Sequence, residues 1–199
     1  MSAVAKYLLA GFVLFFTGCA HKTVNKTTLL SYLQEDRNGT SGAATVNGVR
    51  YKVTFRPNDL IIEHELKAKP GYNKDSLRTV YSDCLYFVLT ISQDSTEIFG
   101  RLSENYETLL RQVSFGMKEL VTLKENRDNG SVFFLADYVY PRMYGSTGGT
   151  SVLLCFQDPG LKQLKEFTIE VKDFLGQSGE YLRFRFLKQD LDHIPDLKL

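Results

Sequence analysis

Histidine and cysteine, the residue types best suited to metal binding and nucleophilic catalysis, are few and widely spaced. The chain holds three of each. His21 lies in a polar segment and His193 in the C-terminal tail, and neither has a partner at the spacing of metal ligands. His64 lies between Glu63 and Glu65, but neighbours on a strand point to opposite faces, so this triplet alone does not form a compact site. We therefore predict no metal site and no cofactor.

Two of the cysteines, Cys84 and Cys155, fall in apolar segments that are expected to be strands. An oxidising compartment would permit a disulfide between them, and two free buried thiols are the alternative. Neither cysteine has a histidine close to it in sequence, and a reactive thiol needs a polarising neighbour. The sequence therefore indicates no catalytic thiol.

The motifs of common hydrolases and phosphate-binding proteins are absent. No Gly-x-Ser-x-Gly occurs, and the glycine-rich stretch at 145–149 lacks the Lys-Ser/Thr of a phosphate-binding loop. Tyr138, Tyr140 and Tyr144 flank this stretch, and tyrosine combines a rigid apolar ring with a hydroxyl suited to recognition. These tyrosines are candidates for a ligand or partner loop, and ordinary use in the core is the alternative. We predict that the protein is not an enzyme.

The N-terminus carries the most specific pattern in the chain. Residues 1–6 contain one positive charge, Lys6, and residues 7–16 form an apolar run. The run is too short to cross a bilayer, which needs about 20 apolar residues. A basic start, a short apolar run and small residues at its end are typical of a secretory signal peptide, which we place at residues 1–18.

The sequence Phe16-Thr17-Gly18-Cys19 closes this leader and resembles the lipobox of bacterial lipoproteins, with Phe16 where the family usually has leucine. The resemblance implies cleavage before Cys19 and attachment of a diacylglyceryl group to its sulfur. Two or more acyl chains hold a protein on a bilayer, whereas one chain binds only marginally. The resemblance also implies a position on the outer membrane facing the periplasm. Ala20 replaces the aspartate that often retains lipoproteins in the inner membrane, and no acidic residue follows it closely.

The charge balance of the chain does not favour attachment through basic residues. The chain has 24 basic and 23 acidic residues, and removal of the leader takes away only Lys6, which leaves a formally neutral chain. A neutral chain gives no support to nucleic-acid binding or to polybasic attachment at a membrane. The length that remains suits one domain.

Residues 19–44 are expected to be the lipidated cysteine and a tether. From His21 to Ala44 the composition is rich in Thr, Asn, Ser, Gly and Lys, which is typical of a flexible linker. Leu29, Leu30 and Leu33 interrupt it at helical spacing. A short helix docked on the domain is therefore the alternative, and the sequence leaves both open.

From residue 45 onward the hydrophobic pattern changes to the two-residue period of strands. Strands are expected at 49–55, 60–66, 84–92, 108–115, 120–124, 131–140, 150–156, 167–171 and 182–186. The segment 108–124 is ambiguous because Leu109, Val113 and Met117 also fit a helix. Turn residues separate the segments, most strongly at Arg127–Gly130. The pattern predicts an all-β domain over residues 45–199, an antiparallel β-sandwich of seven to nine strands, with a signal helix and at most one short helix besides.

The C-terminal pattern from Leu153 to Pro195 resembles small, uncharacterised β-sandwich lipoproteins of Bacteroidota, a likeness that carries no functional residues. We expect a membrane-anchored, non-enzymatic structural or recruiting subunit of an envelope complex, with a protein partner and no nucleic acid. The alternative is a peptide- or glycan-binding module that uses the tyrosine-rich loop. The expected core includes Phe87, Leu89, Phe156, Ile169, Phe184 and Phe186.

Overall fold

The computed structural model describes residues 22–94, 96–98, 106–141, 148–175 and 178–199. The leader, Cys19, His21 and Tyr144 lie outside the described residues. The strands are β1 (Thr23–Val24), β2 (Ser41–Val46), β3 (Val49–Arg56), β4 (Cys84–Gln93), β5 (Thr96–Glu97), β6 (Val121–Glu125), β7 (Val132–Phe134), β8 (Asp137–Val139), β9 (Thr150–Gln157), β10 (Glu166–Lys172), β11 (Tyr181–Leu187) and β12 (Asp196–Leu197). The helices are α1 (Lys26–Gln34), α2 (Asn58–Ala68), α3 (Lys74–Val80), α4 (Tyr106–Arg111), a π-helix (Gln112–Gly116), α5 (Met117–Leu120), α6 (Lys188–Asp192) and short 3-10 helices at Asp36–Asn38 and Pro159–Gln163.

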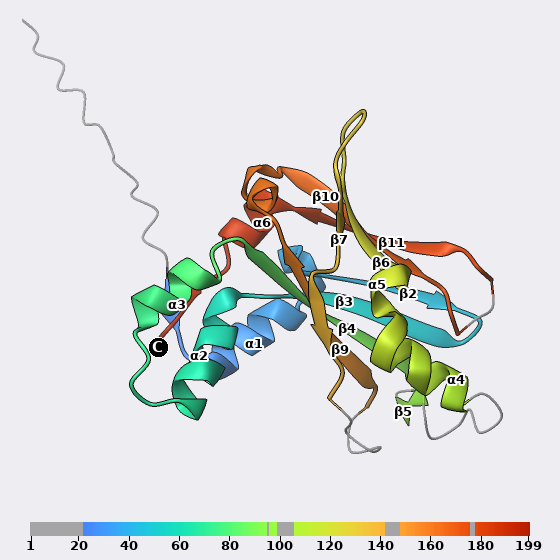
Figure 1. The fold of residues 1–199 in the computed structure, drawn as a ribbon, viewed down its shortest axis with the longest axis horizontal. Coiled ribbons are helices and arrows are strands. Elements are labelled where there is room, and N and C mark those ends of the chain that lie inside the picture. Colours follow the sequence, from blue (N-terminus) through green and yellow to red (C-terminus); the bar gives the residue numbers. More distant parts are fainter. Residues whose placement is uncertain (1–21, 95, 99–105, 142–147, 176–177) are drawn as a thin grey trace, which may run out of the picture.

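Two antiparallel sheets form the body of the molecule (Figure 1). The larger sheet has the order β2-β3-β4-β9-β8, with β5 paired to β4, and the smaller sheet has the order β11-β10-β6-β7. A third, minimal sheet joins β1 and β12 in parallel. The fold is therefore mostly β, as expected, but it contains more helix than the sequence pattern indicated.

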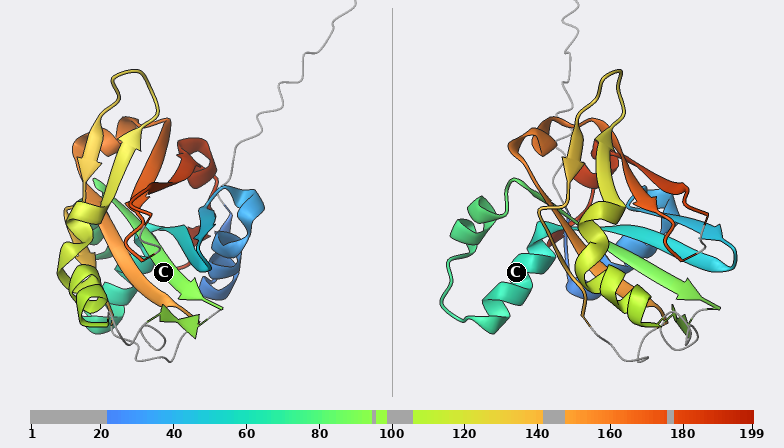
Figure 2. Two further views of the ribbon diagram at one scale, coloured as in Figure 1. Left: turned by 90° about the vertical axis from the view of Figure 1, so that its right-hand side faces the viewer. Right: turned by 45° about the vertical axis from the view of Figure 1, so that its right-hand side comes forward.

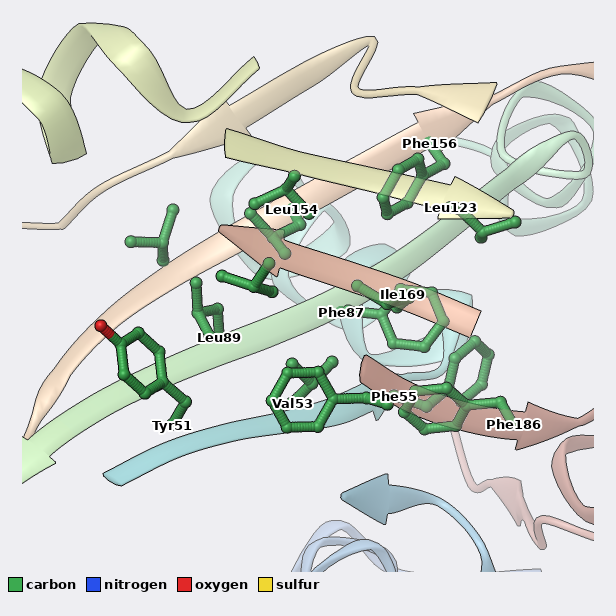
Figure 3. Close-up of a cluster of buried hydrophobic side chains, with 14 of the residues drawn as sticks. Tyr51, Val53, Phe55, Phe87, Leu89, Leu123, Leu154, Phe156, Ile169 and Phe186 are labelled. Carbon is green, nitrogen blue, oxygen red and sulfur yellow. The ribbon is translucent and has the colours of Figure 1, made fainter. Parts of the chain in front are cut away.

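The hydrophobic core lies between the two larger sheets (Figure 3). Strict alternation in β3 places Val49, Tyr51, Val53 and Phe55 on the buried face. Phe87 of β4 reaches across to the smaller sheet, and its ring centroid lies 6.0 Å from that of Phe167 and 5.2 Å from that of Phe186. The predicted core residues are all confirmed as buried: Phe87, Leu89, Phe156, Ile169, Phe184 and Phe186.

The chain passes directly from one sheet to the other between β7 and β8. A single strand over residues 131–140 was expected, but only Leu135 and Ala136 separate β7, at the edge of the smaller sheet, from β8, at the edge of the larger one. At the opposite edges β2 lies against β11. A Cβ built on Gly42 would lie 3.3 Å from the Phe184 ring, so these strands pack closely. The two sheets are thus joined along both sides.

The strand expected at residues 60–66 is wrong, because this segment forms helix α2. Pro57 precedes the helix, and the side-chain amide of Asn58 in its first turn donates to the Tyr81 carbonyl at 2.6 Å. Glu63 accepts from Lys67 at 2.6 Å, an i,i+4 pair that supports a helix. The Ile and Leu residues of this segment fit a strand as well as a helix. The polar contacts of Asn58 and Glu63 favour the helix.

The strand expected at residues 108–115 is also wrong. The segment is helical through α4 and the π-helix, and Leu109, Val113 and Met117 are buried along one side. Phe115, which a strand would have placed with Val113, is 79% exposed. The helical spacing of the apolar residues therefore decided the structure. The strand expected at 120–124 is confirmed as β6, and the turn at Arg127–Gly130 is confirmed by a hydrogen bond between its ends of 2.9 Å.

The tether expected up to Ala44 does not agree with the structure, in which residues 23–44 belong to the folded body. Helix α1 begins where Asn25 Oδ1 accepts from the Thr28 amide at 2.9 Å, and it buries Leu29 and Leu33 completely or nearly so. β1 pairs with β12 near the C-terminus, and β2 pairs with β3 along its whole length. The docked helix, the alternative left open by the sequence, is the correct one.

The helices cover the sheets from different sides (Figure 2). Helices α4 and α5 lie on one flank, and α1 lies on the other next to β3. Helix α2 packs against α3 and β4. Within the described residues, no helix has the length and apolar character needed to cross a membrane.

Candidate ligand groove

The tyrosines expected to form a recognition loop have structural roles where they are described. Tyr138 donates its hydroxyl to the Ser114 carbonyl at 2.9 Å, which ties β8 to the π-helix. Tyr140 is half-buried and packs against the core. Tyr144 is outside the described residues. The structure thus does not bring Tyr138 and Tyr140 together as a free binding surface.

The two cysteines that were candidates for a disulfide are free thiols on neighbouring strands. Cys84 is paired with Gln157 and Cys155 with Tyr86, so the two cysteines are diagonal neighbours on one face of the sheet. Diagonal neighbours are typically about 7–8 Å apart, at or beyond the Cα separation that a disulfide spans without backbone movement. Burial raises the pKa of the Cys155 thiol, which disfavours the thiolate, the nucleophilic form of cysteine.

The described histidines do not form a metal centre. His64 is an exposed residue of α2 instead of the strand residue expected, and His193 follows α6, where its Nδ1 lies 2.6 Å from the Gln189 carbonyl oxygen. Among the described residues, no group of three or more His, Cys, Asp or Glu side chains is placed to hold a metal ion.

A groove lies on the outer face of the larger sheet, the face turned away from the core. Its volume is about 420 Å³, which is within the range of sites for small molecules. The floor comes from alternate residues of β3 and β4 and from the start of β9, and the walls come from α1, the start of α2 and the chain before β9. The described lining residues are Leu30, Leu33, Gln34, Lys52, Thr54, Phe55, Arg56, Leu60, Val88, Thr90, Gly148, Gly149 and Ser151.

The strand register explains which side chains meet on this floor. Lys52 is paired with Thr90, and Thr90 is paired in turn with Ser151, so these three form one row across the sheet. The hydroxyls of Thr90 and Ser151 lie 3.3 Å apart. Thr54 and Val88 form the next row. Residues that face away from the core on these strands therefore form the floor of the groove, although their sequence pattern shows only that they point outward.

One end of the glycine-rich stretch closes the groove, although the sequence directed attention to its tyrosines. A Cβ on Gly149 would lie 3.0 Å from the Ile91 carbonyl oxygen and 3.0 Å from Thr90 Cγ2. A larger residue at position 149 would therefore force the loop or β4 to shift by a few tenths of an ångström, and glycine allows the close approach without that shift.

The groove is basic. Its described lining contains Lys52 and Arg56 and no acidic residue. Lys52 is already partnered, because its Nζ donates to Gln34 Oε1 at 3.2 Å and lies 3.8 Å from Asp36 Oδ1. Arg56 is half-buried, and within the described part of the chain its guanidinium makes no hydrogen bond or ion pair. Sequence reasoning missed Arg56, since alternation marks it only as an outward residue.

A larger cleft of about 730 Å³ lies at one end of the sheets. Its basic side chains are already in ion pairs. Lys162 pairs with Asp83 at 2.5 Å, Arg78 lies 3.5 Å from Asp59, and Lys188 pairs with Asp192. Its three cations thus each have an acidic partner within the cleft. The basic groove is therefore the better candidate site.

Comparison with known proteins identifies no function. No family model and no curated protein matches the chain. Among solved structures, a novel protein of unknown function from Burkholderia pseudomallei K96243 is similar, with 13% sequence identity and a TM-score of 0.38 over 86% of this chain and 97% of that one. The chemistry of the groove therefore rests on the groove's own residues.

Proposed function

We propose that this protein is a lipid-anchored, non-enzymatic protein of the bacterial outer membrane, whose sandwich-like β domain faces the periplasm and recruits a partner. The observation that supports it is the short apolar leader followed directly by Cys19. The structure adds a constraint on geometry. The first described element, β1, begins at Thr23, so three residues, 20–22, lie between the proposed lipidation site and this strand in the sequence.

The anchor is tested by expressing the full chain and its Cys19→Ser variant in a diderm bacterium. The native chain should be recovered with the outer membrane, and intact-mass spectrometry should show an N-terminal acylated cysteine at position 19. The variant should carry no acyl groups because its hydroxyl cannot replace the sulfur nucleophile in thioether formation. A native chain that retains residues 1–18, or that lacks acyl mass, would overturn the anchor.

The recruiting role is tested separately by affinity purification from detergent-solubilised membranes of the native host. A protein partner should co-purify in a fixed stoichiometric ratio. It should remain bound after a wash in high salt if the contact is largely apolar. A chain that purifies alone at every detergent concentration contradicts recruitment without affecting the anchor.

The groove favours a second role, the binding of a small ligand by the anchored domain. Sequence reasoning assigned this role to a tyrosine-rich loop as a peptide or glycan site. The described tyrosines support it less than the groove does, because Tyr138 uses its hydroxyl within the protein. The groove has suitable volume, three hydroxyl-bearing residues and a half-buried cation, Arg56, whose guanidinium makes no hydrogen bond or ion pair with the described residues. These are the elements of a binding site.

A further inference from the structure

Arg56 presents a positive charge to the groove that no described residue neutralises directly. The carboxylate that acts on it electrostatically is Glu63 of α2. This carboxylate already accepts from Lys26 at 2.6 Å and from Lys67 at 2.6 Å. Because both oxygens of Glu63 are engaged by lysines, this carboxylate compensates the charge of Arg56 only in part. The described lining of the groove therefore stays positive.

Arg56 is half-buried, and burying a charged guanidinium without a hydrogen-bonded anion is unfavourable in free energy. Burial lowers the pKa of the guanidinium, and the nearby Glu63 opposes that effect only in part. A bound carboxylate or phosphate would supply the missing acceptors, and the planar guanidinium matches either anion with two parallel hydrogen bonds. The groove is thus electrostatically prepared for an anion at this end.

The rest of the groove indicates what the anion is attached to. Leu60 of α2 and Leu30 of α1 line the groove together with Arg56, and Leu30 is 38% exposed. Val88 lies on the floor between these walls. An apolar chain of a few carbons can lie along these side chains and bury apolar surface there.

We infer that the groove binds a small amphiphilic anion, with its carboxylate or phosphate on Arg56 and its apolar chain along Val88 and Leu30. Thr54, the next outward residue of β3, provides a hydroxyl beside the anionic group. This inference rests on the ligand-binding role proposed above and specifies the class of ligand. A peptide or glycan without a negative charge would leave Arg56 unpaired.

The test uses the full mature chain and three probes with the same tail: octanoate, octyl phosphate and octanol. Isothermal titration calorimetry should show that both anions bind at least about tenfold more tightly than octanol, because a hydrogen-bonded charge contributes more than a neutral hydroxyl. Inorganic phosphate, which has no tail, should bind more weakly than octyl phosphate. Equal binding of octanol and octanoate would overturn the anionic class while leaving a ligand groove in place. No binding of any tailed probe would overturn the groove as a ligand site as well.

Variants locate the site. Arg56→Gln should weaken octanoate binding by about 10- to 100-fold and leave octanol binding nearly unchanged. Arg50→Gln is the matched control, because Arg50 is an exposed residue on the same face of the same strand but outside the groove. Its effect should stay within about twofold. If Arg50→Gln and Arg56→Gln weaken octanoate equally, binding reflects the overall charge of the surface and the proposal is wrong.

Two readouts keep the proposal testable if Arg56→Gln does not fold. Thr54→Val should weaken both anions relative to octanol, and the octanoate-to-octanol ratio of the native chain needs no variant. The source of the anion is separated by competition for bound octanoate. Displacement by phosphatidylglycerol vesicles but not by phosphatidylcholine vesicles indicates a lipid headgroup, and displacement by neither indicates a free small molecule.

Discussion

A buried carboxylate links the two sheets at one end of the core. Asp173, which follows β10, is 2% exposed, and it accepts the Tyr51 hydroxyl of β3 at 2.7 Å (Figure 3 shows the tyrosine). It also accepts from the Ser178 hydroxyl at 2.7 Å and from the amides of Ser178 and Leu175, each at 3.3 Å. These donors satisfy a group whose burial would otherwise be unfavourable.

Replacing Tyr51 by Phe removes one donor from Asp173 and leaves the rest of the ring in place. The free energy of unfolding should fall by about 1.5–3 kcal/mol, the range for a hydrogen bond to a charged group. Urea unfolding measures the change. Tyr181→Phe, a substitution at a tyrosine that is 46% exposed, is the control and should change stability by less than about 0.5 kcal/mol. Equal effects of the two substitutions would show that the buried hydrogen bond contributes nothing net.

At this scale the sequence shows what a residue is but not what it contacts. Alternation in β3 correctly places Tyr51 inward and Arg56 outward. The partners of Tyr51 come from a turn more than a hundred residues later, and the environment of Arg56 is made by two helices. The candidate site could not be predicted from the sequence, because it is formed by contacts between segments far apart in the chain. Each of its residues, taken alone, fits an ordinary strand or helix pattern.

The N-terminal helix α1 is an integral element of the domain. Leu29 is fully buried and Leu33 is 3% exposed, whereas Leu30 between them is 38% exposed. Lys26 in its first turn also donates to Glu63 of α2 at 2.6 Å. The helix therefore forms part of one wall of the groove and makes an ion pair with α2.

Alanine substitutions distinguish this helix from a tether. Leu29→Ala and Leu33→Ala should each destabilise the domain by about 2–5 kcal/mol, as expected for a large buried side chain replaced by alanine. Leu30→Ala, at the residue that directly follows Leu29, is the matched control and should lower the free energy of unfolding far less. Thermal and urea unfolding of the three variants provide the comparison. If all three resemble the native chain, the segment does not stabilise the domain.

Strand elements were predictable where alternation was strict, and helices were missed where apolar residues fitted two periods. β3, β4, β9, β10 and β11 follow the expected segments closely. In α2 the apolar residues are consecutive, so the choice depended on Asn58 and Glu63, whose partners are set by the tertiary structure and the helix itself. The polar segment before residue 45 reads as a linker because one buried helical face of two leucines is too short a signal.

On the scale of the whole molecule, the position of β1 determines how the proposed anchor would hold the domain. Four Cα–Cα steps join Cys19 to Thr23, which span at most about 14 Å when extended. β1 pairs with β12, and the Lys198 amide donates to the Val24 carbonyl at 2.9 Å. The β1–β12 end would therefore lie next to the bilayer. The turn of the β2–β3 hairpin is at the opposite end of the long axis (Figure 1).

This orientation is measurable by energy transfer from a dye on the lipidated chain to acceptors in the bilayer. A dye attached through Lys198→Cys should be strongly quenched, and one attached through Thr45→Cys, an exposed site near the β2–β3 turn, should be quenched much less. Insertion of ten Gly/Ser residues before Thr23 adds about 16–19 Å of average reach and should reduce the difference. Equal quenching at both sites in the native chain would mean that the domain tumbles freely above the membrane, so that the direct junction of anchor and fold does not orient it.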